Sequence, residues 1–139
     1  AQLAANPALA LATFEEVLRV TSPVQAFCRT AGMDTEVAGI KIEEGTKILC
    51  VLGAANLDPD HWPDADKFDI SRKTAGHLAL GAGVHACVGQ NIARAEGRAV
   101  LEALAHRVAR IELIGDPVWK PNNAIHALAH LPLRLVAKP

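Results

Sequence analysis

Two stretches of the chain carry the hydrophobic spacing of amphipathic helices. Between Ala8 and Val20, the apolar residues Leu11, Phe14 and Leu18 recur three or four positions apart. Pro23 disfavours helix at the residue before it, so this helix is expected to end near Thr21–Ser22. A longer helix is predicted from Gly89 to about Arg107, and its small apolar residues share one face: Ile92, Ala95, Ala99 and Ala103.

The rest of the chain favours short strands and irregular structure. Strands are predicted at 36–38 and 40–42 around Gly39, and at 47–51, followed by a short helix at 52–56. Two more, at 110–114 and 131–136, would form a terminal hairpin joined by a turn region at 117–123. Residues 58–75 contain two prolines and little periodicity, which indicates a long functional or self-packed loop. The fold class predicted is α+β.

Composition limits the function. The chain has 139 residues, half of them hydrophobic, and is expected to form one domain without an internal boundary. A net charge of −1 argues against nucleic acid as a partner. No apolar run approaches the roughly 20 residues that cross a bilayer. The N-terminus lacks Met and a basic region, so we expect a piece of a longer chain and not a signal peptide. Three distant cysteines, Cys28, Cys50 and Cys87, fit a reducing cytoplasm.

Cys87 is the candidate for chemistry. It lies in the stretch His77–Gln90, a loop that contains Gly81 and Gly83 and leads into the long predicted helix. Amide donors and the positive end of a helix dipole favour a thiolate, which is the form that ligates iron. Taken alone, a cysteine is more often a small buried hydrophobe. A cysteine-dependent enzyme or redox sensor using Cys87 and His85 is a further alternative.

Four motifs in order resemble the C-terminal part of a cytochrome P450, a haem-thiolate monooxygenase. They are a helical Glu16-x-x-Arg19, a small β-region at 22–30, a meander at 55–72, and the cysteine loop with the helix after it. The resemblance covers nearly the whole chain and implies the C-terminal part of that mainly helical fold. Residues 68–72 of the meander have the form typical of bacterial members.

The resemblance implies roles for individual residues. Cys87 would be the axial ligand of a haem b iron, with backbone N–H groups near Gly89 tuning its sulfur. His85 and Arg29 would meet the haem propionates. Leu80 and Gly81 would lie against the cofactor, Leu80 standing where the family usually has Phe. A buried triad would tie the helix to the meander (Glu16, Arg19 and Arg72), and other side chains would line the substrate cavity or belong to core and turn (Val24, Phe27 and Ala124).

The implied activity is insertion of one oxygen atom from O2 into a small organic substrate, with electrons from a ferredoxin and a ferredoxin reductase. Residues 22–25 and 73–77 are similar to members that oxidise para-substituted benzoic acids, so an aromatic acid is the finer expectation. The distal helix with its acid–threonine pair is not in this sequence. A polypeptide of these residues alone is therefore expected to lack turnover and to expose an apolar haem-facing side. The alternative is a haem-free, non-catalytic domain that folds or self-associates.

Overall fold

The computed structural model describes residues 2–139. Its helices are α1 (Gln2–Ala5), the 3-10 turn η1 (Pro7–Leu9), α2 (Ala10–Thr21), α3 (Leu52–Ala55), the 3-10 turn η2 (Gly83–His85) and α4 (Gln90–Arg107). Its strands are β1 (Phe27–Thr30), β2 (Thr35–Val37), β3 (Ile40–Ile42), β4 (Lys47–Cys50), β5 (Val108–Leu113), β6 (Val118–Trp119), β7 (Leu128–His130) and β8 (Leu133–Ala137). The prediction of an α+β fold is confirmed.

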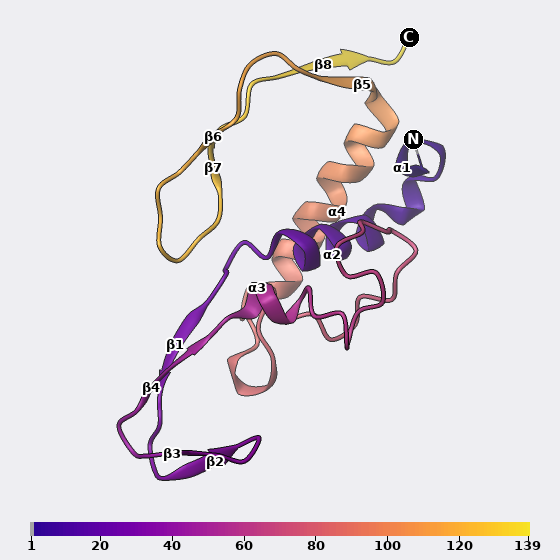
Figure 1. The fold of residues 1–139 in the computed structure, drawn as a ribbon. Helices are drawn as coiled ribbons and strands as arrows, with labels where there is room; N and C mark the ends of the chain where they lie inside the picture. The colour runs from indigo at the N-terminus through magenta and orange to yellow at the C-terminus, as the bar shows by residue number, and fades with distance from the viewer. Residues whose placement is uncertain (1) are drawn as a thin grey trace.

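Helices α2 and α4 cross at the centre of the molecule (Figure 1). Helix α2 ends where predicted, because Ser22 adopts a left-handed φ of 39° directly before Pro23. The apolar face predicted for α4 is on the surface: Ile92 is 65% exposed, and Ala95, Ala99 and Ala103 are exposed as well. The first helix, α1, has too few residues to show periodicity and was not predicted.

Two antiparallel hairpins extend from the helices toward one end of the molecule (Figure 1). Strand β1 pairs with β4, with Phe27 opposite Cys50, and β2 pairs with β3 beyond them. The β2–β3 turn is Ala38–Gly39, where φ is 51° and 81°. Positive φ at both central residues matches the natural twist of a tight hairpin. These strands and the short helix α3 confirm the prediction for residues 36–56.

The C-terminal hairpin is longer than predicted. Strands β5 and β8 pair antiparallel, but β6 and β7 form a second ladder inside the segment expected to be a turn. The strand predicted at 131–136 is β8, which starts two residues later than predicted, at Leu133, while β7 ends at His130. Pro132 has no N–H to donate, so the ladder breaks there, while its carbonyl accepts a 3.0 Å bond from the Ile114 amide.

The meander packs by its own side chains between α3 and η2. It contains neither helix nor strand between residues 58 and 75, as predicted, and the irregular structure continues to residue 82. Three apolar side chains from it are buried: Trp62, Ala65 and Ile70. The Trp62 indole donates a 3.2 Å hydrogen bond to the Ala55 carbonyl, which anchors the meander to α3. Within residues 2–139, no helix is both long and apolar enough to cross a membrane.

Candidate functional site

The cysteine loop contains a closed turn that requires glycine at position 81. Gly81 has a φ of 70°, and a Cβ there would lie 2.5 Å from the His85 carbonyl oxygen. The Cys87 amide closes the turn with a 2.8 Å hydrogen bond to the Leu80 carbonyl. The 3-10 turn η2 lies between them. The backbone therefore fixes where Cys87 stands before any ligand is considered.

The thiol of Cys87 is free and exposed. Helix α4 starts three residues later, with Gly89 as its N-cap. A Cβ added to Gly89 would lie 3.9 Å from Sγ, so the glycine leaves the sulfur close to bare backbone. In the part of the chain that the structure describes, the amides of Val88, Gly89 and Asn91 donate no hydrogen bond. These groups and the helix dipole give the sulfur an electropositive surrounding.

Glu16 is the centre of a buried ion-pair network behind the loop. Its carboxylate accepts two 2.8 Å hydrogen bonds from the guanidinium of Arg19, and both side chains are 0% exposed. Arg72 reaches it at 3.3 Å, and the Asp69 amide donates at 3.0 Å. Burial alone would raise the pKa of Glu16, but these hydrogen bonds and the two positive charges hold it below its usual value. The structure thus brings all three residues of the expected triad together.

Arg19 and Arg72 also hold the backbone of the meander. Arg19 donates to the carbonyls of Asn56 and Ala65 at 2.8 and 2.9 Å. Arg72 donates to the carbonyls of Pro63 and Asp64 at 2.6 and 3.0 Å. The network is therefore a clamp between α2 and the meander, and the single carboxylate of Glu16 orients both guanidinium groups.

A second network on the same helix was missed by sequence reasoning. Glu15 accepts hydrogen bonds from Arg94 of α4 at 2.5 Å and contacts the His77 ring at 2.8 Å. Burial raises the pKa of Glu15, and the two partners outweigh it and lower the pKa. The available signal was the pair of adjacent glutamates. Neighbouring positions on a helix point in different directions, so the buried carboxylate of Glu16 and the largely buried carboxylate of Glu15 each need their own partners.

Of the remaining predicted residues, His85 lies within the loop, and Arg29 and Phe27 lie in β1 outside it. Arg29 is exposed on β1 and donates 3.1 Å to the Cys28 carbonyl, and no ion pair joins it to a carboxylate within residues 2–139. His85 is exposed at the end of η2. Phe27 opens β1 and is 45% exposed. In residues 2–139, no hydrogen bond or ion pair joins the Arg29 side chain to the cysteine loop.

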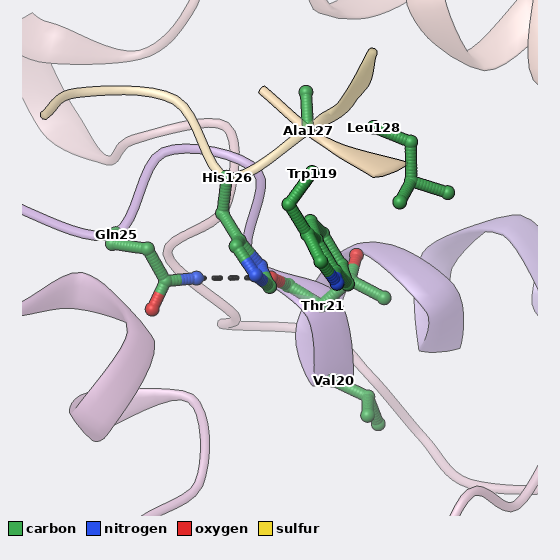
Figure 2. Close-up of a pocket in the computed structure, with 7 residues that line it drawn as sticks. All are labelled: Val20, Thr21, Gln25, Trp119, His126, Ala127 and Leu128. Atoms are coloured by element: carbon green, nitrogen blue, oxygen red, sulfur yellow. Dashed lines mark hydrogen bonds between the residues drawn. The ribbon is translucent and has the colours of Figure 1, made fainter. Parts of the chain in front are cut away.

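The two segments expected to line a substrate cavity meet each other. Val24 forms an antiparallel bridge with Ile125, the neighbour of Ala124, and the His126 amide donates 2.7 Å to the Pro23 carbonyl. Beside this junction is an open pocket of about 490 Å³ between the end of α2 and the β6–β7 hairpin. Figure 2 shows the rings of Trp119 and His126 stacked along it. Their centroids are 4.1 Å apart.

The model of the family "Cytochrome P450" matches residues 6–113. The chain belongs to the cytochrome P450 family. It is 52% identical over 135 residues to cytochrome P450 CYP199A2 of Rhodopseudomonas palustris, covering 97% of this chain and 33% of that protein. The chain thus spans about a third of the length of that relative.

Other cytochromes P450 give the same result. The chain is 40% identical over 129 residues to a Mycobacterium tuberculosis beta-dihydromenaquinone-9 omega-hydroxylase, covering 93% of this chain and 26% of that protein. The crystal structure of CYP108D1 from Novosphingobium aromaticivorans matches with a TM-score of 0.91 and 40% identity, covering 99% of this chain and 33% of that one. The prediction of a C-terminal portion of the cytochrome P450 fold is confirmed.

Cytochromes P450 bind haem iron through a cysteine thiolate. The donor set of this chain fits such a group. Among the described residues, no group of three His, Cys, Asp or Glu side chains could bind a metal ion directly. A haem would need only one protein donor from this chain, and Cys87 could supply it. Cys87 is an exposed thiol, and the backbone beside it at Gly81 and Gly89 carries no side chain. Val84 and Val88, at 97% and 102% exposure, present apolar surface around it.

Proposed function

We propose that the protein containing this chain is a haem-thiolate monooxygenase, and that Cys87 is the axial ligand of its haem iron. The observation that carries the proposal is the exposed Cys87 thiol, held by the Leu80 carbonyl beside unpaired amides at the start of α4. A thiolate-ligated haem supplies O–O bond cleavage when bound. The chain supplies the sulfur, and the amides near Gly89 tune it by hydrogen bonding.

The propionates would be held by Arg29 and His85. Arg29 presents a planar fork of donors that matches a carboxylate, and its charge is not engaged by any acid in the described chain. His85 follows the turn that positions Cys87. Leu80 and Gly81 would lie against the macrocycle, as the resemblance implies.

The substrate would be a small, mostly apolar organic molecule that receives one oxygen atom from O2. Val24, Phe27 and Ala124 are the side chains of this chain proposed to meet it. The finer proposal is an aromatic acid, which rests on the similarity of residues 22–25 and 73–77 to members with such substrates. A ferredoxin and a ferredoxin reductase would supply the electrons, and we place the protein in the cytoplasm.

Two alternatives have less support. A cysteine-dependent enzyme needs a base within hydrogen-bond reach of its nucleophile. In residues 2–139 no hydrogen bond joins the His85 ring to the Cys87 thiol. A haem-free, non-catalytic domain would leave the four ordered motifs without a role, and none of the relatives described above favours it.

The test is the reduced carbonyl spectrum of the full-length protein. Replacing Cys87 by Ser should abolish the thiolate-type Soret band, because a serine hydroxyl cannot replace the thiolate as an electron donor. Cys28→Ser is the matched control, since Cys28 is also exposed but lies in β1, and it should keep the band. A band that survives in Cys87→Ser would show that another residue ligates the iron.

A further inference from the structure

His77 is a buried imidazole with two defined contacts. Its side chain is 4% exposed. Nε2 lies 2.8 Å from Oε2 of Glu15, and Nδ1 accepts a 3.2 Å hydrogen bond from the Ala79 amide. Because a backbone N–H can only donate, Nδ1 must be the unprotonated nitrogen, and the proton on Nε2 points at Glu15. The contacts therefore fix both the tautomer and the orientation of the ring.

The carboxylate that orients His77 is itself held from another helix. Arg94 donates from Nε to Oε1 of Glu15 at 2.5 Å and from Nη2 to Oε2 at 3.4 Å. Arg94 is braced in turn by a 2.7 Å bond to the side chain of Gln90. Glu15 belongs to α2, and Arg94 and Gln90 belong to the first turns of α4. Through Glu15, His77 is thus connected by hydrogen bonds to both central helices, α2 and α4.

The other contact of His77 leads to the cysteine. The amide that donates to its Nδ1 belongs to Ala79, which is buried. The next residue, Leu80, provides the carbonyl that accepts the 2.8 Å bond from the Cys87 amide. The turn is completed by a 2.9 Å bond from the Gly81 amide to the Leu78 carbonyl. The amide held by His77 and the carbonyl that holds Cys87 therefore belong to two consecutive residues.

We infer that His77 is a positioning residue for the cysteine loop: its Nδ1 holds the buried Ala79 amide, and through Leu80 this contact fixes the backbone of Cys87. The inference rests on the proposed function only for the purpose of this placement, which is to orient the Cys87 thiolate toward the haem iron. The geometric part concerns only the chain itself. Without His77 the Ala79 amide would be buried and unpaired, which is costly, so the turn would open to find water.

Two substitutions separate the contacts of the ring. The side-chain oxygen in His77→Asn can still accept from the amide two residues on, as Asn commonly does, but it is too short to reach Glu15. The amide in His77→Gln can reach Glu15, but its side chain puts no acceptor where Nδ1 stands. If His77 acts through Ala79, His77→Asn should behave like the unmodified protein, and His77→Gln should not.

The first measurement is hydrogen exchange in the haem-free, full-length protein, followed by mass spectrometry over peptides spanning residues 78–88. We expect exchange about tenfold faster in His77→Gln, the size of effect that one lost buried hydrogen bond gives, and unchanged exchange in His77→Asn. Equal rates in His77→Gln and the unmodified protein would overturn the inference, as would equally fast exchange in both variants. Should His77→Gln not fold, His77→Asn decides: unchanged exchange supports the inference and faster exchange overturns it.

The second measurement is the reduced carbonyl spectrum after haem loading. His77→Gln should shift intensity from the thiolate-type to the thiol-type Soret band, and His77→Asn should not. If the unmodified protein shows no thiolate-type band while the exchange pattern is as expected, the proposed function fails and the positioning role stands. If the unmodified protein has the band and His77→Gln keeps both the band and the slow exchange, the positioning role fails and the proposed function stands.

Discussion

Phe14 of α2 packs directly on Gly97 of α4, so closely that the aromatic ring occupies the space a Cβ of residue 97 would need. Gly97 lies in the middle of an 18-residue helix, where glycine is otherwise unfavourable. The close crossing of the two helices explains its presence. Helix α2 carries both Glu15 and Glu16, and α4 follows Cys87. The packing of Phe14 on Gly97 therefore helps to position both ion-pair networks relative to the cysteine loop.

Gly97→Ala should therefore destabilise the protein despite the better helix propensity of alanine. Forcing a methyl group into a packed contact typically costs about 1–3 kcal/mol. Urea unfolding measures the change. Gly32→Ala is the matched control, because Gly32 has nothing within 4 Å of an added Cβ. A Gly97→Ala protein as stable as the Gly32→Ala protein would show that the ring of Phe14 moves aside at little cost.

The Glu16 network should show non-additive energetics. Arg19 and Arg72 share one carboxylate, so Arg19→Ala and Arg72→Ala should couple in a double-mutant cycle, typically by about 0.5–3 kcal/mol. Removing one partner from a buried pair typically costs about 3–5 kcal/mol, since the other charge is left uncompensated. The Lys67–Asp64 pair, 67% and 65% exposed, provides a control cycle with weak coupling. Simple additivity for Arg19 and Arg72 would contradict a shared network.

Stability should fall in acid because of both glutamates. The pKa values of Glu15 and Glu16 are lowered in the folded protein from an ordinary value of 4.5. A lowered folded pKa means that the unfolded chain binds protons first. The stabilisation is therefore complete above about pH 4.5 and is lost as the pH falls through the folded values. Urea midpoints measured across this range should fall less steeply in Glu15→Gln. An unchanged slope would mean that Glu15 does not contribute.

Part of this arrangement could be predicted from sequence. The two long helices follow from apolar spacing, and the β2–β3 hairpin follows from the position of Gly39. The β6–β7 ladder could not be predicted, because two- and three-residue strands have no measurable alternation. Glu16, Arg19 and Arg72 were named through the family motif. The Glu15–His77–Arg94 cluster joins residues 62 and 79 positions apart, and no local pattern connects them.

The cysteine loop offers a matched pair of glycines. Gly81 and Gly83 both have left-handed φ, 70° and 56°, so alanine at either position adds backbone strain. Only Gly81 also faces an obstacle, the His85 carbonyl, whereas Gly83 has open space. Gly81→Ala should thus lower the fraction of protein that shows the thiolate-type Soret band more than Gly83→Ala does. Equal spectra in the two variants would show that the His85 carbonyl does not restrict the loop.

A polypeptide of residues 1–139 alone should self-associate and lack turnover. Its large exposed apolar side chains include Val84, Val88 and Ile92, and the alanines of one face of α4 are exposed as well. Exposed patches beyond a few hundred Å² tend to mark contact surfaces. Light scattering after size exclusion should show oligomers, and NADH consumption with ferredoxin and reductase should not yield product.

The face of α4 can be tested directly. Ile92→Glu combined with Ala99→Lys places charges on that face without changing net charge, and it should shift the polypeptide toward monomer. Val37→Glu is the control, because Val37 is 59% exposed but lies on the distant β2–β3 hairpin, so oligomers should persist there. A clean monomer of the unmodified polypeptide would remove the argument from exposed surface. One that also retains haem and couples NADH consumption to product would show that this chain alone completes the site.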